Sequence, residues 1–497
     1  MPPRSSAPAL TLSRVLSFLL VLLAFAPSAR AQPAPAPAPA LPPPVAAALA
    51  RADIPESAVG IFVQDVASTR PSLAINAGQP MNPASTMKLV TTFAALELLG
   101  PAYAWRTEAY ATGPVRDGVL EGDLVLKGYG DPRLALEDFW LLQRALRQRG
   151  VRDIRGDLVL DRSWFEPGDV DPGRFDGEPL RAYNVAPDAL LVNFKTVRFL
   201  FLPEPERAAV RIVPEPRLPQ VDVVNNMRLA QGACGDWRAS VKLDVQEAVP
   251  PAPLRVSFTG TMPAACGERA WNVSLLGHAA YAGGLFRSLW EESGGTLRGG
   301  IREGPVPADA RLLYTHESPS LAEVVRDVNK FSNNVMSRQV FLTLSAEMLK
   351  LPARADRSTR VVQSWLGAQG LAMPELVLEN GSGLSRVERI SAASLGRLLV
   401  AAFRSPVMPE LVSSLPLAGY DGTLRKQPRI DPTAGRAHLK TGSLAEVRSI
   451  AGYVFDRKGR RQALVFIVNH PNAAQADAAI SALVRWVYGE RGERVEP

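Results

Sequence analysis

Three short polar motifs occur in this sequence, separated by very unequal lengths of chain. They are Ser-Thr-Met-Lys at residues 85–88, Ser-Asn-Asn at 332–334 and Lys-Thr-Gly at 440–442. Ser85 and Ser332 are 247 positions apart, whereas Ser332 and Lys440 are 108 apart. If the motifs meet in one site, a large piece of chain must be inserted after the first motif. The 497 residues also exceed one hydrophobic core, so several domains are expected.

The N-terminus has the pattern of a secretory signal. Arg4 and Arg14 are followed by an apolar run that ends near residue 26, and Ala-Arg-Ala occupies 29–31. This pattern predicts a signal peptide over 1–31. An uncleaved anchor is disfavoured, because a membrane span needs roughly twenty apolar residues. Residues 32–44 predict an extended Pro/Ala-rich spacer. We therefore expect an exported periplasmic protein without a permanent membrane span, at most loosely associated with the envelope.

Charge and cysteine content narrow the classes of function. The formal net charge of +7 includes three arginines of the signal, which leaves +4 for the mature chain. This mild charge is compatible with an anionic envelope polymer and is too small to indicate nucleic acid binding. Cys234 and Cys266 are the two cysteines, and export favours a disulfide over two buried thiols. Neither has a partner at metal-ligand spacing, so no metal and no cofactor are predicted.

The first motif can supply a nucleophile and its base. Pro83 precedes it, and the pattern predicts a helix over residues 85–99. Ser85 and Lys88 then lie on one face about one turn apart, so the amine can reach the hydroxyl. A serine hydroxyl must lose its proton to a base during attack. Lys88 can accept that proton if burial or a second cation lowers its pKa, and Lys440 is the expected cation.

The second motif can supply a proton relay and an amide ligand. Ser332 and Asn334 are two positions apart, which lets both side chains face one cleft from a loop before a helix. Ser332 would pass a proton to the leaving amine, and Asn334 would hydrogen-bond the substrate amide. The alternative is a simple helix N-cap, for which Ser and Asn are favoured.

The third motif predicts an anion-binding strand at the edge of a sheet, although a tight turn is the alternative. Thr441, Ser443 and Lys440 would hold a substrate carboxylate. Gly442 would leave room for a substrate lying along the strand edge. The backbone N–H groups of Ser443 and Ser85 would form an oxyanion hole.

The remaining pattern predicts an α+β catalytic unit interrupted by a β-rich insertion. Short apolar strands between frequent Gly and Pro residues predict that 105–307 form the insertion, divided into two subdomains. Residues 45–104 and 308–497 would form the catalytic unit, a sheet with helices packed on it. The elements expected there are a strand at 59–66, helices at 321–349 and 392–403, a hairpin of strands at 448–456 and 462–469, and a helix at 473–488.

Further short strings accompany the three motifs: Gly-Asp-Pro at 130–132, Asn-Gly-Ser-Gly-Leu-Ser at 380–385 and Asp-Gly-Thr-Leu at 421–424. On these residues the chain resembles the D-alanyl-D-alanine carboxypeptidase/endopeptidase family, the class C low-molecular-mass penicillin-binding proteins of peptidase family S13. That family more often has an acidic residue where Asn380 stands. We expect a turn that frames the site there, and no effect of the difference on catalysis.

The resemblance implies a fold and a reaction. The expected fold is a catalytic domain like that of penicillin-binding proteins and serine β-lactamases, with an antiparallel sheet flanked by helices. The expected reaction is hydrolysis of peptidoglycan stem peptides ending in D-Ala-D-Ala, and of cross-links, through an acyl-enzyme on Ser85. β-Lactam antibiotics would acylate the same serine, so penicillin would inhibit the enzyme.

Two other functions remain as alternatives. A class A β-lactamase has the same three motifs, but it is compact and carries a Glu-x-x-Leu-Asn element that this sequence lacks. A non-catalytic peptidoglycan-binding envelope protein would keep the fold without the chemistry. The intact Ser85, Lys88 and Ser332 argue against that second alternative.

Overall fold

The computed structural model describes residues 40–246, 252–426 and 431–489. The predicted signal over 1–31 lies outside these residues. Most of the predicted spacer over 32–44 also lies outside them, and helix α1 (Pro43–Arg51) begins at its end with a proline in the first turn. Among the described residues, no helix is both long and apolar enough to cross a membrane.

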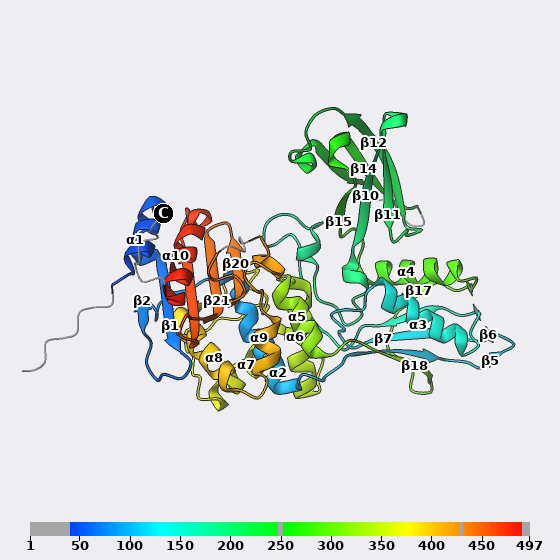
Figure 1. Cartoon of the computed structure of the whole chain (residues 1–497). Helices are drawn as coiled ribbons and strands as arrows, with labels where there is room; N and C mark the ends of the chain where they lie inside the picture. The colour runs from blue at the N-terminus through cyan, green and yellow to red at the C-terminus, as the bar shows by residue number, and fades with distance from the viewer. Residues whose placement is uncertain (1–39, 247–251, 427–430, 490–497) are drawn as a thin grey trace, which may run out of the picture. The chain divides into compact units, whose positions relative to one another are not determined.

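A five-stranded antiparallel sheet forms the centre of the catalytic unit (Figure 1). Its strand order is β2 (Leu73–Ile75), β1 (Val59–Asp65), β22 (Arg461–Asn469), β21 (Val447–Phe455) and β20 (Ala437–Leu444). The first long strand, β1, pairs with the last, β22, from Val59 opposite Val468 to Asp65 opposite Gln462. The strand that carries the third motif, β20, lies at one edge of this sheet, as predicted.

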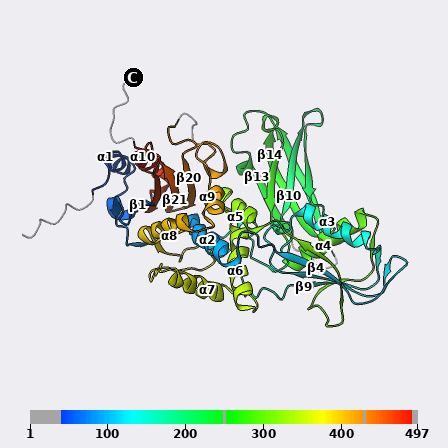
Figure 2. The ribbon, with the colours of Figure 1, turned by 60° about the horizontal axis from the view of Figure 1, so that its bottom comes forward.

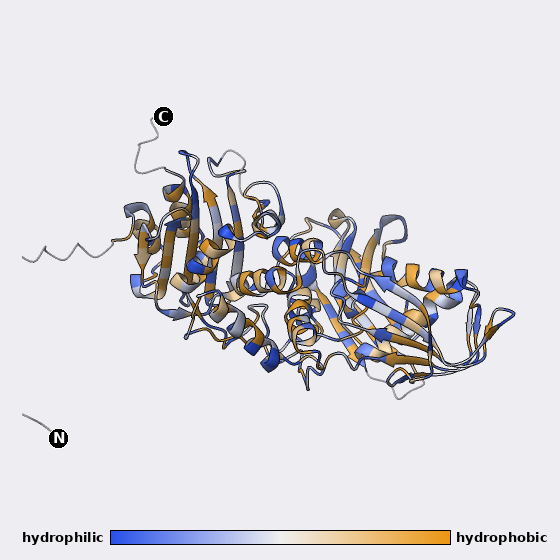
Figure 3. Cartoon of the chain, turned by 90° about the horizontal axis from the view of Figure 1, so that it is seen from below, coloured by the Kyte–Doolittle hydropathy of each residue, from blue (hydrophilic) through white to orange (hydrophobic). Residues whose placement is uncertain are grey.

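Both faces of this sheet are buried. In β22, Val465 and Ile467 face a core shared with α2 (Lys88–Leu99) and α8 (Ala392–Arg404). The alternating residues Leu464, Phe466 and Val468 face a core shared with α1 and α10 (Asp477–Tyr488). A strand covered on both sides has no polar face, which explains the nearly continuous apolar sequence of β22. Figures 2 and 3 show the helices beside the sheet and the apolar character of its strands.

The helical stretch predicted over 321–349 is two helices, α5 (Leu321–Lys330) and α6 (Asn334–Leu349). The chain breaks between them at Ser332, whose φ of 56° lies in the left-handed region. Asn333 then caps α6 by accepting a hydrogen bond from the Met336 N–H at 3.1 Å. Two further helices of the catalytic unit, α7 (Ala355–Ala368) and α9 (Met408–Ser414), were not predicted.

The insertion leaves and returns along two paired strands. Strand β4 (Arg106–Ala111) lies antiparallel to β18 (Arg311–Glu317), with Arg106 opposite Glu317. Both belong to a sheet completed by β7 (Leu124–Gly128), β9 (Leu158–Asp161) and β17 (Ile301–Glu303). Because β18 is part of this sheet, we propose that the insertion extends to residue 317 rather than 307.

The insertion also contains a six-stranded sheet and two helices. The strands are β10 (Val197–Glu204), β11 (Ala209–Glu215), β12 (Val221–Ala230), β13 (Val241–Gln246), β14 (Leu254–Pro263) and β15 (Arg269–Val273). A disulfide joins Cys234 to Cys266 next to this sheet. Helices α3 (Leu136–Gln148) and α4 (His278–Glu292) were not predicted, although Phe139, Leu142 and Leu146 have helical spacing and are buried.

Two smaller sheets complete the fold. One contains β5 (Val115–Arg116), β6 (Val119–Leu120), β8 (Asp153–Ile154) and β16 (Thr296–Leu297), and the other pairs β3 (Pro80–Met81) with β19 (Ile390–Ser391).

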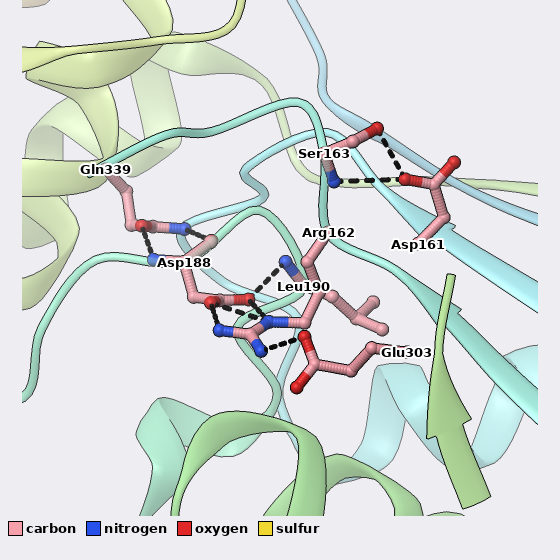
Figure 4. Close-up of polar contacts among 7 residues, drawn as sticks. All are labelled: Asp161, Arg162, Ser163, Asp188, Leu190, Glu303 and Gln339. Atoms are coloured by element: carbon pink, nitrogen blue, oxygen red, sulfur yellow. Dashed lines mark hydrogen bonds and ion pairs between the residues drawn. The ribbon is translucent and has the colours of Figure 1, made fainter. Parts of the chain in front are cut away.

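A polar network connects the insertion to α6 (Figure 4). Gln339, which is fully buried on α6, accepts a hydrogen bond from the Asp188 N–H at 2.9 Å and donates one to the Asp188 carbonyl at 2.8 Å. The Asp188 carboxylate accepts from Arg162 Nε at 2.9 Å, and Arg162 also pairs with Glu303 at 2.6 Å. Since α6 begins at Asn334, this network ties the insertion to the helix that carries part of the second motif.

Candidate active site

The predicted nucleophile lies in a 3₁₀ turn that leads directly into helix α2. Residues Ala84–Met87 form a 3₁₀ turn, and α2 begins only at Lys88, so the helix predicted from residue 85 starts three residues later. Ala84 has a φ of 46°, which costs a non-glycine residue about 1–3 kcal/mol and persists only where the surroundings enforce it. Asn82 enforces it, because its Oδ1 accepts from the Ala84 N–H at 2.9 Å. Ser85 is the one partly exposed residue of this turn.

The amine of Lys88 meets three polar groups from different parts of the chain. Its Nζ lies 3.0 Å from Ser85 Oγ and 2.7 Å from Asn334 Oδ1, and it also contacts the Ser382 carbonyl oxygen. Lys88 itself is completely buried. The first two motifs therefore meet around one amine, as predicted, and the Asn-Gly-Ser-Gly turn at 380–383 supplies the third contact.

These three contacts satisfy a neutral amine. An amide oxygen and a carbonyl oxygen only accept, so they take the two N–H groups of an uncharged amine. The remaining lone pair then faces the Ser85 hydroxyl and can accept its proton. Burial, followed by the charges of Lys440 and Arg338, lowers the pKa of Lys88 well below its usual value. The geometry is compatible with the base form of Lys88, and burial together with the two neighbouring cations favours that form.

The second and third motifs meet at Ser332. The Nζ of Lys440 donates to Ser332 Oγ at 2.8 Å and to the Thr441 carbonyl at 2.6 Å. Because Lys440 occupies a lone pair of this hydroxyl, the O–H of Ser332 stays available as a donor. Lys440 is fully buried, and burial lowers its pKa to about 7. Its charge therefore reaches a ligand through neighbouring hydroxyls rather than by direct contact.

Hydroxyl groups and one arginine line the exposed edge of β20. Thr441 Oγ1 lies 2.8 Å from Thr423 Oγ1, which belongs to the Asp-Gly-Thr-Leu string. Ser443 is exposed and accepts a hydrogen bond from Arg448, which is on the neighbouring strand β21. Arg448 was missed at the sequence level, because its position beside Ser443 depends on the pairing of two strands. Arg448 also pairs with Asp477 at 3.7 Å, and its guanidinium lies nearer to the exposed Ser443 than the buried Lys440 amine does.

Packing inside the protein gives a further reason for a glycine at position 442. A Cβ at this position would lie 2.2 Å from Ser449 Oγ, 2.8 Å from the Pro83 carbonyl oxygen and 3.0 Å from the Ser85 nitrogen. Because Gly442 has no side chain, the backbone of β20 can pack closely against the turn that carries Ser85.

Gly442→Ala is accordingly expected to displace Ser85. The change should slow acylation by a penicillin about 100-fold, since small misplacements of reacting groups can cost that much. Overpacking should also lower the free energy of unfolding by about 1–3 kcal/mol. Stopped-flow labelling with a fluorescent penicillin measures the acylation rate, and thermal unfolding measures the loss of stability. Gly367→Ala in α7, where a Cβ meets nothing within 4 Å, is the matched control and should leave labelling unchanged. A wild-type rate in Gly442→Ala would refute this packing argument.

A cavity of about 310 Å³ separates a loop of the insertion from the Asn-Gly-Ser-Gly turn. Its lining includes Asp171, Arg174 and Phe175 from the insertion. Asn380 and Arg386 line it on the catalytic side. The insertion thus contributes side chains of both charges beside a turn that contacts Lys88.

Comparison with known proteins agrees with this fold. A crystal structure of penicillin binding protein 4 (dacB) from Haemophilus influenzae superposes with a TM-score of 0.75 at 23% identity, covering 89% of this chain and 99% of that chain. A second crystal structure of that Haemophilus influenzae protein, in complex with a β-lactam, superposes with a TM-score of 0.71 at 23% identity, again covering 89% of this chain and 99% of that chain. The chain therefore has the penicillin-binding-protein fold, and the predicted fold class is confirmed.

Sequence comparison defines the family. The family described as D-Ala-D-Ala carboxypeptidase 3 (S13) matches residues 42–488, and this chain belongs to it. The D-alanyl-D-alanine carboxypeptidase of Actinomadura sp. (strain R39) is 32% identical over 440 residues, covering 85% of this chain and 79% of that protein. DacB of Haemophilus influenzae, also a D-alanyl-D-alanine carboxypeptidase, is 25% identical over 419 residues, covering 84% and 86%. The resemblance inferred from the motifs is thereby confirmed.

Proposed function

We propose that this protein is a serine D-Ala-D-Ala carboxypeptidase and D,D-endopeptidase. It would act on peptidoglycan stem peptides and cross-links through an acyl-enzyme on Ser85. Family membership and the carboxypeptidase relatives support the substrate. The observation that carries the mechanism is the 3.0 Å contact between the buried Lys88 Nζ and Ser85 Oγ, across which a neutral amine can accept the hydroxyl proton. The predicted signal segment supports a periplasmic location.

Acylation begins when Ser85 Oγ attacks the carbonyl carbon of the penultimate D-alanine. The proton of the hydroxyl passes to Lys88 Nζ as the new C–O bond forms. The charge that develops on the carbonyl oxygen faces the backbone N–H groups of Ser85 and Ser443, the proposed oxyanion hole. No metal or cofactor takes part in this scheme.

The C–N bond then breaks, and the leaving amine needs a proton. Ser332 donates it through the hydroxyl proton that its contact with Lys440 leaves free, and it is reprotonated from the lysines of the site. Water next hydrolyses the ester, releasing the shortened peptide and restoring the Ser85 hydroxyl. A cross-link reacts in the same way, with a peptide amine instead of D-alanine as the leaving group.

The edge of β20 would bind the substrate. Its Thr441 and Ser443 hydroxyls would donate hydrogen bonds to a terminal carboxylate, and Arg448 adds a positive charge beside them. The Asn334 amide N–H₂ would bind a substrate carbonyl, because its oxygen is already occupied by Lys88. Lys440 and Gly442 act here through charge and close packing.

Mass spectrometry of purified peptidoglycan treated with the enzyme tests this proposal. We expect loss of terminal D-alanine and opening of cross-links, which are distinct changes of mass. Enzyme pretreated with penicillin is the control and should produce neither. Rapid turnover of the penicillin itself would instead favour the β-lactamase alternative. Unchanged peptidoglycan with an unlabelled Ser85 would favour a non-catalytic binding protein.

A further inference from the structure

A carboxylate is buried behind the Lys88 amine. Glu388 has no exposed surface. Its Oε1 accepts hydrogen bonds from the N–H groups of Glu379, Asn380 and Gly381 at 3.1, 3.0 and 2.9 Å, and its Oε2 accepts from the Gly383 N–H at 2.9 Å. All four are donors, so the site is built for the ionised form of the acid. An isolated charge would be too costly to bury, and these donors replace its water.

The turn at residues 379–383, which Glu388 holds, packs between helices α2 and α6. The Gly381 carbonyl accepts from Thr91 Oγ1 of α2 at 2.7 Å and from Ser337 Oγ of α6 at 2.8 Å. A Cβ on Gly383 would lie 1.9 Å from the Ala84 carbonyl oxygen, directly before the nucleophile. Between these two glycines, Ser382 presents its carbonyl to Lys88 Nζ.

We propose that Glu388 is a positioning residue for the catalytic base: its carboxylate holds the 379–383 turn so that the Ser382 carbonyl takes one N–H of Lys88. This proposal rests on the proposed function of Ser85 and Lys88. With that N–H taken and a second directed at Asn334, the lone pair of the neutral amine can face only the Ser85 hydroxyl. Glu388 thus sets the direction in which the base acts without touching the substrate.

The same carboxylate also balances the charges around Lys88. Lys440 on β20 and Arg338 on α6 lower the pKa of Lys88, whereas Glu388 raises it. Burial raises the pKa of Glu388 itself, and its backbone N–H donors oppose that rise. Removing the negative charge should therefore lower the pKa of Lys88 further. The fraction of neutral base at low pH would rise, even though its lone pair is aimed less well.

Two substitutions distinguish the effect of the length of the Glu388 side chain from the effect of its negative charge. Glu388→Gln keeps the length and loses the charge, and it turns an N–H₂ group toward backbone donors. Glu388→Asp keeps the charge and is too short to hold the turn. The second-order rate of Ser85 acylation by a fluorescent penicillin is measured against pH. We expect both variants to lower the plateau rate about tenfold or more. The acid limb, the range in which the acylation rate falls as the pH is lowered, should move toward lower pH only in Glu388→Gln, because only this variant removes the charge that raises the pKa of Lys88.

Glu375→Gln is the matched control. Its carboxylate accepts from the Ser391 and Ser394 hydroxyls at 2.6 and 2.5 Å and should leave both plateau and limb unchanged. An unshifted limb in folded Glu388→Gln overturns the proposal, as does a wild-type plateau. If Glu388→Gln does not fold, Glu388→Asp decides: a lowered plateau with an unshifted limb supports the proposal, and any other result overturns it. Wild-type enzyme that penicillin never labels would instead refute the proposed function itself.

Discussion

Replacing Ser85 by alanine is expected to abolish both D-alanine release and labelling by penicillin. Loss of a covalent nucleophile removes the acyl-enzyme route entirely, so the rate should fall by roughly 10⁴-fold or more. The neighbouring amine, Lys88, cannot substitute, because it is completely buried. Product analysis by mass spectrometry and in-gel fluorescence measure the two activities.

Ser413→Ala provides the control for this substitution. Ser413 is exposed on α9, and its hydroxyl donates to the Glu410 carbonyl of its own helix. Both activities should remain at the wild-type level in this variant. Persistent labelling of Ser85→Ala would show that another residue is the nucleophile, and the proposed acyl-enzyme on Ser85 would then be wrong.

Lys88→Met is expected to have the second largest effect, because it removes the base while keeping an unbranched side chain in the same space. General base catalysis typically contributes about 10²–10⁴-fold, and acylation should slow by that factor. In the wild type the base works above the pKa of Lys88 and is lost as the pH falls through it. Burial and Lys440 lower that pKa, so wild-type activity should persist at lower pH than an ordinary lysine allows.

The pH profile distinguishes this role from a structural one. The acid limb of acylation should vanish in Lys88→Met, since no proton on residue 88 then competes with catalysis. Lys242→Met, at an exposed position of β13, should keep both rate and limb. A Lys88→Met enzyme that retains the wild-type limb would assign the titration to another group.

The parts of the fold that the sequence predicts well are those with strong local patterns. The hairpin of β21 and β22 was expected within one or two residues, because two long apolar strands flank a turn that contains Gly459. The spacing of the motifs indicates a large insertion, and short apolar strands between Gly and Pro residues locate it. The meeting of Ser85 and Lys88 also followed from local spacing, which depends little on the rest of the chain.

The parts that were missed depend on tertiary contacts. The second motif predicts a loop before a helix, but the left-handed backbone of Ser332, in a stretch with neither Gly nor Pro, is visible only in the folded chain. Glu388 looks like a surface residue in sequence, and it is buried because α2 and α6 close over the turn that it holds. Arg448 reaches Ser443 across a strand pair, so its place at the site depends on sheet register.

Because β4 pairs with β18, the two ends of the insertion lie side by side, and the catalytic unit need not change when the insertion changes in length. Arg106 and Glu317 are 211 positions apart in the chain, yet they lie opposite each other. Opposed residues of an antiparallel pair are about 4.5–5.5 Å apart, the spacing that a tight hairpin turn also bridges. Closing so long a loop costs entropy. Burial of the insertion's own hydrophobic core offsets this cost, so the catalytic unit does not have to. An insertion of another length could occupy the same position while Ser85 and Lys88 stay in place, provided that it keeps the contacts of Asp188 with Gln339 on α6.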